Sequence, residues 1–240
     1  MTIDVRWKDT MAIAISDARW DAYDAIIEGE IAAYKNRFKT TLTEDVDALL
    51  IKAMLWAESG GPDNIAWTTR PLHIGSGGDP AYQILKTGAE GSDFIMSTDL
   101  ANLMKGGSIN DPKTNIKAGI AYLYTRMATT NIVSVRDLKD ANEYVYVVQP
   151  GEDLNIISQN VGTTVFELKR LNPTASSFIH SNQTLKYVKA EMQRSVSGWL
   201  RFTIDNIADR YNGGRDPEYV AKLEYLIKNI IPNLVRTQKL

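Results

Sequence analysis

The sequence contains no cysteine and only two histidines, His73 and His180. The lack of cysteine excludes disulfide bonds, thiolate metal sites and cysteine nucleophiles, and it suits a protein that works in either redox compartment. The two histidines lie far apart in the sequence, so no zinc site is expected. We expect a protein that uses neither a metal ion nor another cofactor.

Long hydrophobic runs are also missing. No stretch of about 18 apolar residues occurs, so the sequence predicts no membrane-spanning helix. The first nine residues lack the apolar segment of a signal peptide. The expectation is a protein made in the cytoplasm without a signal peptide, which needs another route if it acts outside the cytoplasm.

The charge balance excludes a further class of protein. The 27 Lys and Arg and the 29 Asp and Glu give a net charge of −2, which argues against a general nucleic-acid-binding protein. A hydrophobic content of 44% and a charged content of 23% are ordinary for a globular protein. The 240 residues suffice for one large domain or two small ones.

An apolar helix over residues 49–58 is the most informative stretch that is present. Leu50, Met54 and Leu55 share one helical face, and the Gly-Gly-Pro that follows at 60–62 cannot continue a helix. Glu58 therefore lies on the last turn of a mostly buried helix.

This position disfavours a negative charge on Glu58. The C-terminal end of a helix dipole is already negative, and apolar surroundings oppose ionisation. A carboxylic acid that keeps its proton is the donor that cleavage of a glycosidic bond requires. The alternative is that Glu58 simply reaches solvent at the helix end.

Periodic apolar residues indicate that most of the chain is helical. They predict helices over residues 16–39, 43–58, 80–86, 97–105, 112–127, 191–211 and 217–230. Residues 60–80 are rich in Gly, Pro, Thr and Ser, which predicts an irregular loop with a possible short hairpin. Such a loop after a candidate acid is where the wall of a substrate cleft is expected.

A different pattern occupies residues 144–188. β-Branched and aromatic runs predict strands over 144–148 and 183–188, and two short helical patterns lie between them at 154–160 and 164–171. This strand–helix–helix–strand unit is small for an independent core.

Three local motifs, taken in order, resemble those of soluble-type lytic transglycosylases and goose-type lysozymes. The Glu58-Ser59 pair resembles the catalytic motif of these families. Residues 115–123, Asn-Ile-Lys-Ala-Gly-Ile-Ala-Tyr-Leu, resemble their Asn-Ile-x-x-Gly-x-x-Tyr-Leu helix, and residues 208–214 resemble their closing Tyr-Asn-x-Gly motif. Together the motifs cover roughly residues 40–140 and 190–232. His73 stands where the families carry the glutamine of a Gly-Leu-Met-Gln loop.

The resemblance implies a peptidoglycan glycosidase that cleaves between N-acetylmuramic acid and N-acetylglucosamine. Glu58 would be the general acid and base, and the substrate-binding residues would be Ser59, His73, Asn115, Tyr211 and Asn212. For His73, a hydrogen bond to sugar or backbone is expected more than proton transfer.

The product of the reaction stays open at this point. A transglycosylase uses Glu58 twice and forms a 1,6-anhydro sugar, whereas a lysozyme uses a second carboxylate to activate water. Asp79 and Asp93 are the candidates for that carboxylate. Asp79 directly precedes Pro80, so a helix-capping role is the simpler interpretation.

The inserted unit resembles a LysM domain. Residues 146–154 resemble the opening Tyr-x-Val-x-x-Gly-Asp-Thr-Leu pattern, and later segments resemble Leu-x-x-x-Asn and Gly-Gln-x-Leu, with Asn182 in place of the glycine. Asn still tolerates a left-handed turn. The resemblance implies glycan binding by two loops, and the residues that it indicates are Gly151, Glu152, Asp153, Leu154, Thr174 and Ile179. The alternative is an insertion that has lost binding.

The predicted fold class is therefore α+β and mainly α. A lysozyme-like helical domain, formed by residues 1–141 and 190–240, is interrupted by a βααβ LysM-like domain at 142–189. A compact insertion whose ends are adjacent is tolerated in a surface loop.

The expected partner is the glycan strand of peptidoglycan, and we expect no nucleic acid partner and no membrane-spanning segment. The missing signal peptide fits a phage endolysin released by a holin, a tail-associated phage protein, or an injected antibacterial effector, which would have secretion machinery and an immunity protein as partners. Each would act in the periplasm or cell wall. The alternative is a non-catalytic cell-wall-binding or structural protein that uses only the LysM-like unit.

Overall fold

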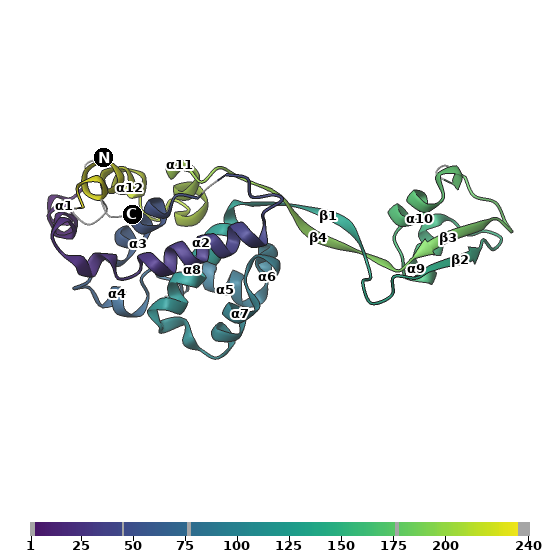
Figure 1. Ribbon diagram of the computed structural model, residues 1–240, viewed down its shortest axis with the longest axis horizontal. Coiled ribbons are helices and arrows are strands. Elements are labelled where there is room, and N and C mark those ends of the chain that lie inside the picture. The colour runs from purple at the N-terminus through teal and green to yellow at the C-terminus, as the bar shows by residue number, and fades with distance from the viewer. Residues whose placement is uncertain (1–2, 45, 76–77, 176–177, 235–240) are drawn as a thin grey trace. The chain divides into compact units, whose positions relative to one another are not determined.

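The computed structural model describes residues 3–44, 46–75, 78–175 and 178–234. The protein is α+β and mainly helical, and its chain divides into two compact units (Figure 1). The helical unit is formed by the described parts of Met1–Thr129 and Val196–Leu240, and the small unit is Thr130–Ser195. Over the described residues, every helix is too short or too polar to cross a membrane.

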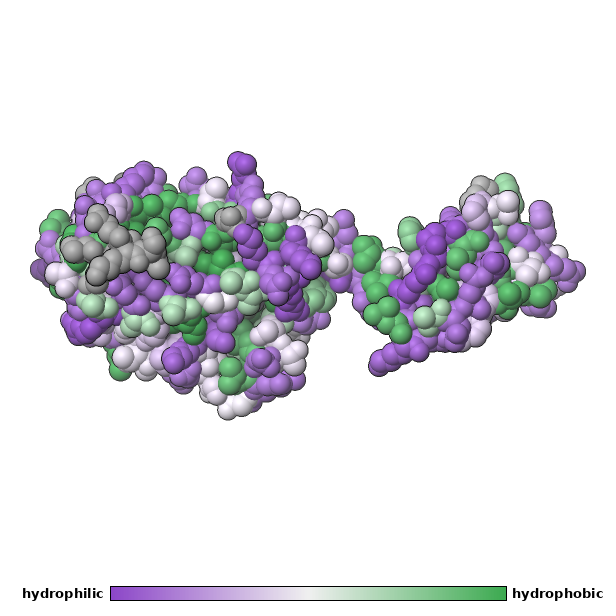
Figure 2. Space-filling model, viewed as in Figure 1, coloured by the Kyte–Doolittle hydropathy of each residue, from purple (hydrophilic) through white to green (hydrophobic). Residues whose placement is uncertain are grey.

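The helical unit contains helices from both of its chain segments. They are α1 (Val5–Ala12), α2 (Asp24–Arg37), α3 (Ala48–Ser59), α4 (Ile65–Thr69), α5 (Pro80–Thr87), α6 (Ser92–Ile95), α7 (Thr98–Lys105), α8 (Pro112–Met127), α11 (Ile204–Ile207), the π-helical turn η6 (Ala208–Asn212), α12 (Tyr219–Tyr225) and the π-helical turn η7 (Leu226–Ile230). Polar and apolar residues are interspersed over the visible face of each unit (Figure 2).

Helix α3 is buried on nearly all sides, which explains why its sequence is apolar around the whole helix. Asp47 caps its first turn by accepting a hydrogen bond from the N–H of Leu49 at 2.9 Å. Gly60 ends it in the left-handed conformation, with φ of 72°. The helix packs against both α2 and α12.

Helix α8 is the second central element. Asp111 caps it and Pro112 occupies its first turn, as the sequence predicts. It packs against α2, α5, α6, α7 and η6, so it joins the two chain segments of the helical unit. Gly119 lies where α8 meets Leu72, and a Cβ built on this glycine would stand 2.4 Å from Leu72 Cδ1.

The small unit contains β2 (Glu143–Val147), α9 (Leu154–Val161), α10 (Val165–Leu171) and β3 (Thr184–Val188), in the predicted order. Strand β2 pairs antiparallel with β3, and Tyr146 lies opposite Leu185. Its core consists of Val148, Ile157, Val161, Leu168, Ala175 and Leu185. Asn182 has φ of 67°, so the predicted left-handed turn at this asparagine is confirmed.

A second pair of strands flanks this βααβ core in the sequence: one strand comes before it and the other after it. Strand β1 (Ala128–Arg136) pairs with β4 (Ala190–Trp199), and the pair lies mostly within the small unit. It is attached to α10 there, because Ser134 Oγ lies 2.6 Å from Thr164 Oγ1 and Arg136 bonds Glu167 at 3.1 Å. The unit is therefore larger than residues 142–189.

The structure corrects three sequence-based expectations. The predicted helix at 191–211 is wrong for the residues of β4. Met192, Val196 and Trp199 recur at a spacing close to that of a helix, but the backbone here pairs with β1 as a strand. The helix predicted from residue 43 begins only at Ala48. The segment 60–80 contains α4, which Asn64 caps, and its described residues form no strand.

Candidate functional site

A pocket of about 520 Å³ opens at the C-terminal end of α3, entirely within the helical unit. Its walls come from the last turn of α3, the segment between α4 and α5, helix α8 and the segment that follows η6. The lining residues are Glu58, Leu72, His73, Ile74, Gly78, Asp79, Pro80, Ala81, Tyr122, Tyr211, Asn212, Arg215 and Asp216. The structure thus brings Glu58, His73, Asp79, Tyr211 and Asn212 together, as the sequence predicts.

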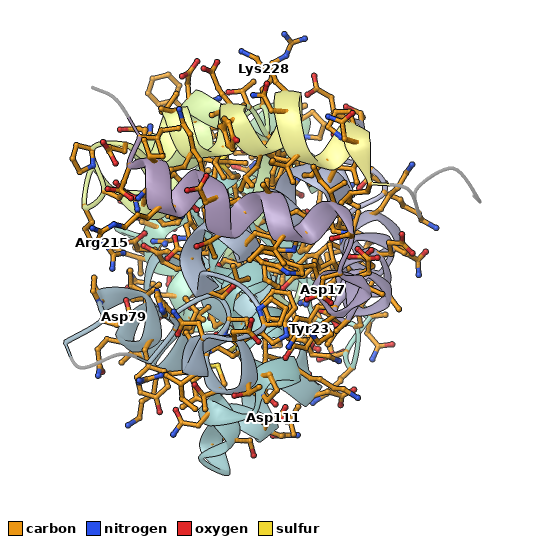
Figure 3. The ribbon with its side chains drawn as sticks, turned by 90° about the vertical axis from the view of Figure 1, so that its left-hand side faces the viewer. Asp17, Tyr23, Asp79, Asp111, Arg215 and Lys228 are labelled. Atoms are coloured by element: carbon orange, nitrogen blue, oxygen red, sulfur yellow. The ribbon has the colours of Figure 1, made fainter. Side chains whose placement is uncertain are left out.

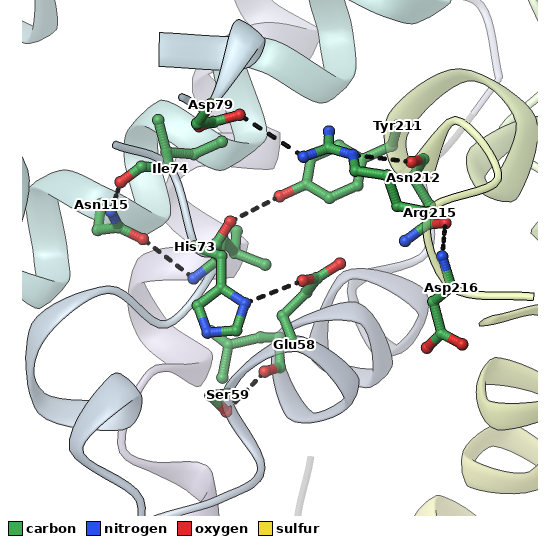
Figure 4. Close-up of polar contacts among 12 residues, drawn as sticks. Glu58, Ser59, His73, Ile74, Asp79, Asn115, Tyr211, Asn212, Arg215 and Asp216 are labelled. Carbon is green, nitrogen blue, oxygen red and sulfur yellow. Dashed lines mark hydrogen bonds and ion pairs between the residues drawn. The ribbon is translucent and has the colours of Figure 1, made fainter. Parts of the chain in front are cut away.

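Glu58 and His73 lie side by side in this pocket and point toward one another (Figure 4). Oε2 of Glu58 lies 3.3 Å from Nδ1 of His73. The Glu58 side chain is only 16% exposed, whereas that of His73 is 47% exposed. A largely buried carboxyl group therefore has a solvent-accessible imidazole as its neighbour.

The segment that carries His73 is held by buried side chains from α8 and η6. Asn115, which is fully buried, accepts a hydrogen bond from Leu72 N–H at 3.0 Å and donates one to the Ile74 carbonyl at 2.7 Å. Tyr211 donates its hydroxyl to the Leu72 carbonyl at 3.1 Å. Asn115 does not line the pocket, so it positions the segment and does not supply the predicted sugar contact.

Two buried tyrosines face the carboxyl group of Glu58. Burial raises the pKa of Tyr211 well above its ordinary value, and the negative charges of Glu58 and Asp79 add to this effect. Burial and the charge of Glu58 likewise raise the pKa of Tyr219. Both phenols therefore keep their protons at neutral pH. The sequence analysis did not single out Tyr219, which lies five residues after the Tyr-Asn-Gly-Gly motif.

Asp79 reaches the pocket, but both of its oxygens are engaged. Oδ1 caps α5 by accepting a hydrogen bond from Ala81 N–H at 3.0 Å, and Oδ2 accepts one from Gly75 N–H at 2.9 Å. Arg215 lies 3.7 Å from Oδ1, and Figure 3 shows both residues on the same side of the unit. The capping role that the sequence offered for Asp79 is confirmed. Sequence analysis missed Arg215.

The remaining wall of the pocket is a turn held together by Asn212. Its Oδ1 accepts a hydrogen bond from the N–H of Asp216 at 2.9 Å, and its carbonyl accepts one from Arg215 Nε at 3.1 Å. The carboxylate of Asp216 bonds Lys222 at 2.7 Å. Asn212 lines the pocket and stabilises this turn.

Two predicted residues do not reach the pocket. Ser59 is buried, and its hydroxyl donates to the Leu55 carbonyl at 2.7 Å, because the side chain folds back along α3. Asp93 is exposed in the first turn of α6 and is not among the lining residues. Within the described residues, no group of three or more His, Asp or Glu side chains is arranged to hold a metal ion.

In the small unit, the first predicted glycan-binding loop is built on internal hydrogen bonds. Glu152 accepts hydrogen bonds from the Tyr146 hydroxyl at 2.8 Å and from Gln149 N–H at 2.9 Å. These bonds lower the pKa of the Glu152 carboxyl. Asp153 caps α9 through Ile156 N–H at 2.8 Å, and Gly151 has φ of 84°. The two carboxylates thus stabilise the loop.

The second loop presents apolar surface. Ile179 of this loop and Leu154 of the first loop pack partly against the core of the small unit, and Thr174 is exposed. Residues 176–177 lie outside the described residues. Phe178, which the sequence analysis did not single out, is 80% exposed. An aromatic side chain with this exposure is available to stack on a ligand.

Comparison with known families identifies this part of the chain. Residues 146–187 match the LysM domain family. The chain therefore carries a LysM domain in its small unit, and LysM domains bind the glycan chains of peptidoglycan. No curated protein matches the chain, and no solved structure does.

Proposed function

We propose that the protein is a peptidoglycan-cleaving glycosidase in which Glu58 is the general acid and the LysM domain holds the enzyme on its substrate. The proposed bond is the β-1,4 linkage from N-acetylmuramic acid to N-acetylglucosamine. The proposed place of action is the bacterial cell wall. The likeness of the helical unit to lytic transglycosylases and goose-type lysozymes is part of this proposal.

The observation that carries the proposal is the position of Glu58. It is a carboxyl group that lines a pocket of about 520 Å³, with 16% of its side chain exposed, on the last turn of a buried helix. A carboxyl group in such a pocket is the type of group that donates a proton to the leaving oxygen of a glycoside. The motif residues Asn115 and Tyr211 both hold the segment beside it.

The surroundings of Glu58 favour the single-carboxylate reaction. A lysozyme-type mechanism needs a second carboxylate that can activate water, at a separation of about 6.5–9.5 Å for inversion. Asp79 is bound by two backbone N–H groups and Arg215, and Asp93 is not at the pocket. We therefore propose that Glu58 protonates the leaving oxygen and then removes the proton of the muramic 6-hydroxyl, which forms a 1,6-anhydro product.

The LysM domain contributes binding to the polymer. A second attachment to the same insoluble substrate raises the effective concentration of the catalytic pocket at the wall without any change in the pocket itself. The domain lies at 146–187, between the two chain segments of the helical unit. The proposed wall binding and the proposed cleavage would therefore be carried out by one chain.

The test is the cleavage of purified peptidoglycan by Glu58→Gln and by Asp93→Asn. The first substitution keeps the shape and removes the transferable proton, so turnover should disappear. The second is a matched control, because it removes an exposed carboxylate of the same unit that lies away from the pocket. Mass spectrometry of the wild-type products should find 1,6-anhydro ends. Turnover by Glu58→Gln would remove Glu58 from the acid role.

A further inference from the structure

We propose that Arg215 determines the substrate of the pocket. Its guanidinium binds a carboxylate on the muramic acid side of the glycan, so the pocket prefers peptidoglycan to an uncharged N-acetylglucosamine polymer. This inference rests on the proposed function and assigns a residue to the recognition of its substrate. It begins from one observation: among the described residues that line the pocket, Arg215 is the only lysine or arginine. A guanidinium that faces a pocket attracts an anionic group of the ligand.

A tight turn directly after η6 brings Arg215 to the pocket. Gly213 and Gly214 have φ of 63° and 74°, in the left-handed region that glycine adopts without strain. The backbone N–H of Arg215 then donates to the Asn212 carbonyl at 3.4 Å, and Nε of the same arginine donates to that carbonyl at 3.1 Å. The guanidinium is therefore held along one edge by its own turn.

The other edge of the guanidinium keeps its hydrogen-bonding capacity. Nη1 of Arg215 lies 3.7 Å from Asp79 Oδ1, which makes an ion pair that is longer than a hydrogen bond (Figure 4). Both oxygens of Asp79 already accept from backbone N–H groups, those of Gly75 and Ala81. The Arg215 side chain is 57% exposed, whereas that of Asp79 is 5% exposed. Asp79 thus orients the guanidinium and leaves its Nη groups accessible to a ligand.

The carboxyl groups around Arg215 have partners of their own. Asp216 accepts a hydrogen bond from Lys222 at 2.7 Å, so its charge is balanced by that ammonium group. The charge of Asp79 is stabilised by backbone N–H groups as well as by Arg215. Glu58 is the remaining carboxyl group among the described lining residues, and it belongs to a different wall, the last turn of α3. A carboxylate of the ligand can therefore take Arg215 as its partner.

Arg215 and Glu58 both lie near the phenol of Tyr211. Burial raises the pKa of Tyr211, the charge of Glu58 raises it further, and the charge of Arg215 lowers it. All three residues line the same pocket. A carboxylate bound by Arg215 would therefore belong to a sugar at or next to the bond that Glu58 is proposed to cleave.

The chemistry of the glycan supplies such a carboxylate. N-acetylmuramic acid carries a lactyl ether that ends in a carboxyl group, where N-acetylglucosamine carries a hydroxyl. This carboxyl group is either free or joined by an amide bond to a stem peptide, which has carboxylates of its own. A planar guanidinium pairs with a carboxylate through parallel N–H···O bonds. Arg215 thus recognises the feature by which muramic acid differs from N-acetylglucosamine.

The experiment measures kcat and KM of the wild type, Arg215→Gln and Arg210→Gln on soluble glycan strands. Peptide-free and peptide-bearing strands are each used in two forms, with free carboxylates and with the carboxylates converted to neutral methylamides. Arg215→Gln should lower kcat/KM for the charged form about tenfold, mainly through a higher KM, and should change the neutral form by less than about twofold. Arg210→Gln should change neither, because Arg210 is a 49% exposed arginine of η6 that does not line the pocket.

The two kinds of strand distinguish the two sources of the carboxylate. A selective loss on peptide-free strands assigns the lactyl carboxylate, and a selective loss confined to peptide-bearing strands assigns the stem peptide. An equal loss on charged and neutral forms of both strands overturns the role of Arg215 in recognition, because damage to the fold lowers all rates alike. Glu58 would still be the proposed acid in that case.

A second measurement needs no turnover and separates this inference from the proposed function. In Glu58→Gln, the Nε–H resonance of Arg215 is followed by NMR and is assigned by its loss in the double variant with Arg215→Gln. The probes are muramic tetrasaccharides, with and without stem peptides, and the uncharged N-acetylglucosamine tetrasaccharide. The resonance should shift with a muramic probe and not with the uncharged one. A wild type that cleaves no strand contradicts the proposed function, whereas an Arg215 resonance that ignores every muramic probe overturns this inference.

Discussion

The side-chain amide of Asn115 accepts a hydrogen bond from the backbone N–H of Leu72 at 3.0 Å, although the two residues are 43 positions apart in the sequence. The same amide donates to the carbonyls of Ile74 and Ile109. A buried polar group of α8 thus takes the place of secondary structure for the segment that carries His73.

We predict that Asn115→Leu lowers both stability and activity. The substitution leaves one N–H and two carbonyls of buried backbone without a partner, at about 1–3 kcal/mol for each unsatisfied group. The melting temperature should fall by several degrees, and kcat should fall further because the segment beside Glu58 loses its position. Asn102→Leu, an exposed site on α7, is the control and should change neither quantity. A melting temperature that stays at the wild-type value would show that the hydrogen bonds of Asn115 are dispensable.

Tyr211→Phe is expected to slow cleavage more than it destabilises the protein. The ring packs at 5.5 Å from that of Tyr122 and is retained, whereas the hydroxyl bond to the Leu72 carbonyl is lost. Loss of one hydrogen bond that orients the site should lower kcat roughly ten- to hundredfold, equivalent to about 1–3 kcal/mol in the barrier. Turnover rates and melting curves measured together distinguish the two effects. Equal rates would mean that the Tyr-Asn-Gly-Gly motif serves only to end a helix.

Removal of residues 130–195 should leave a folded helical unit that cleaves soluble fragments. The cut ends lie together, because Ser197 Oγ donates to the Thr129 carbonyl at 3.2 Å, and a short Gly-Ser linker can close the gap. Sedimentation with insoluble peptidoglycan should fall sharply, since the LysM domain is gone. If the shortened protein still sediments like the wild type, the LysM domain does not hold this enzyme on the wall.

Phe178→Ala should weaken binding to the wall without a loss of stability. The ring is 80% exposed, so it contributes little to the core, whereas stacking on a sugar ring is worth on the order of 1 kcal/mol. The dissociation constant measured by sedimentation should rise about fivefold. Phe166→Ala provides the matched control, because Phe166 is a 60% exposed phenylalanine of the same unit on α10, outside the two loops. Equal binding by both variants would remove Phe178 from the glycan site.

Lys52→Met is expected to make stability depend on pH. Lys52 is 3% exposed and bonds Asp21 at 2.8 Å and Asp24 at 2.7 Å. Burial already raises the pKa of Asp24, and Lys52 opposes that rise. Without the ammonium group, the folded state binds a proton more tightly than the unfolded state, so the free energy of unfolding should fall as pH rises through the carboxyl range. Thermal melts between pH 4 and pH 7 measure this slope. Parallel curves for variant and wild type would contradict it.

Several elements could be predicted from the sequence because their signals are local. Helix α3 ends at Ser59, where Gly-Gly-Pro follows, and α8 begins at Pro112 after its capping residue Asp111. The order β2, α9, α10, β3 follows from turn residues and alternating patterns within about 45 residues. Each of these features depends on neighbours within a few positions along the chain.

The tertiary structure alone decided the rest. The spacing of the apolar residues in β4 is typical of a helix. The segment forms a strand because it pairs with β1, which lies more than 50 residues away in the sequence. The contact from His73 to Glu58 and the engagement of Asp79 by Arg215 likewise join segments that no local pattern connects. The sequence by itself indicated Glu58, His73 and Tyr211 as residues of the proposed site, and the pocket contains all three. Their pairing depended on long-range packing, because a hydrogen bond or an ion pair forms only when the folded core brings its two partners within reach.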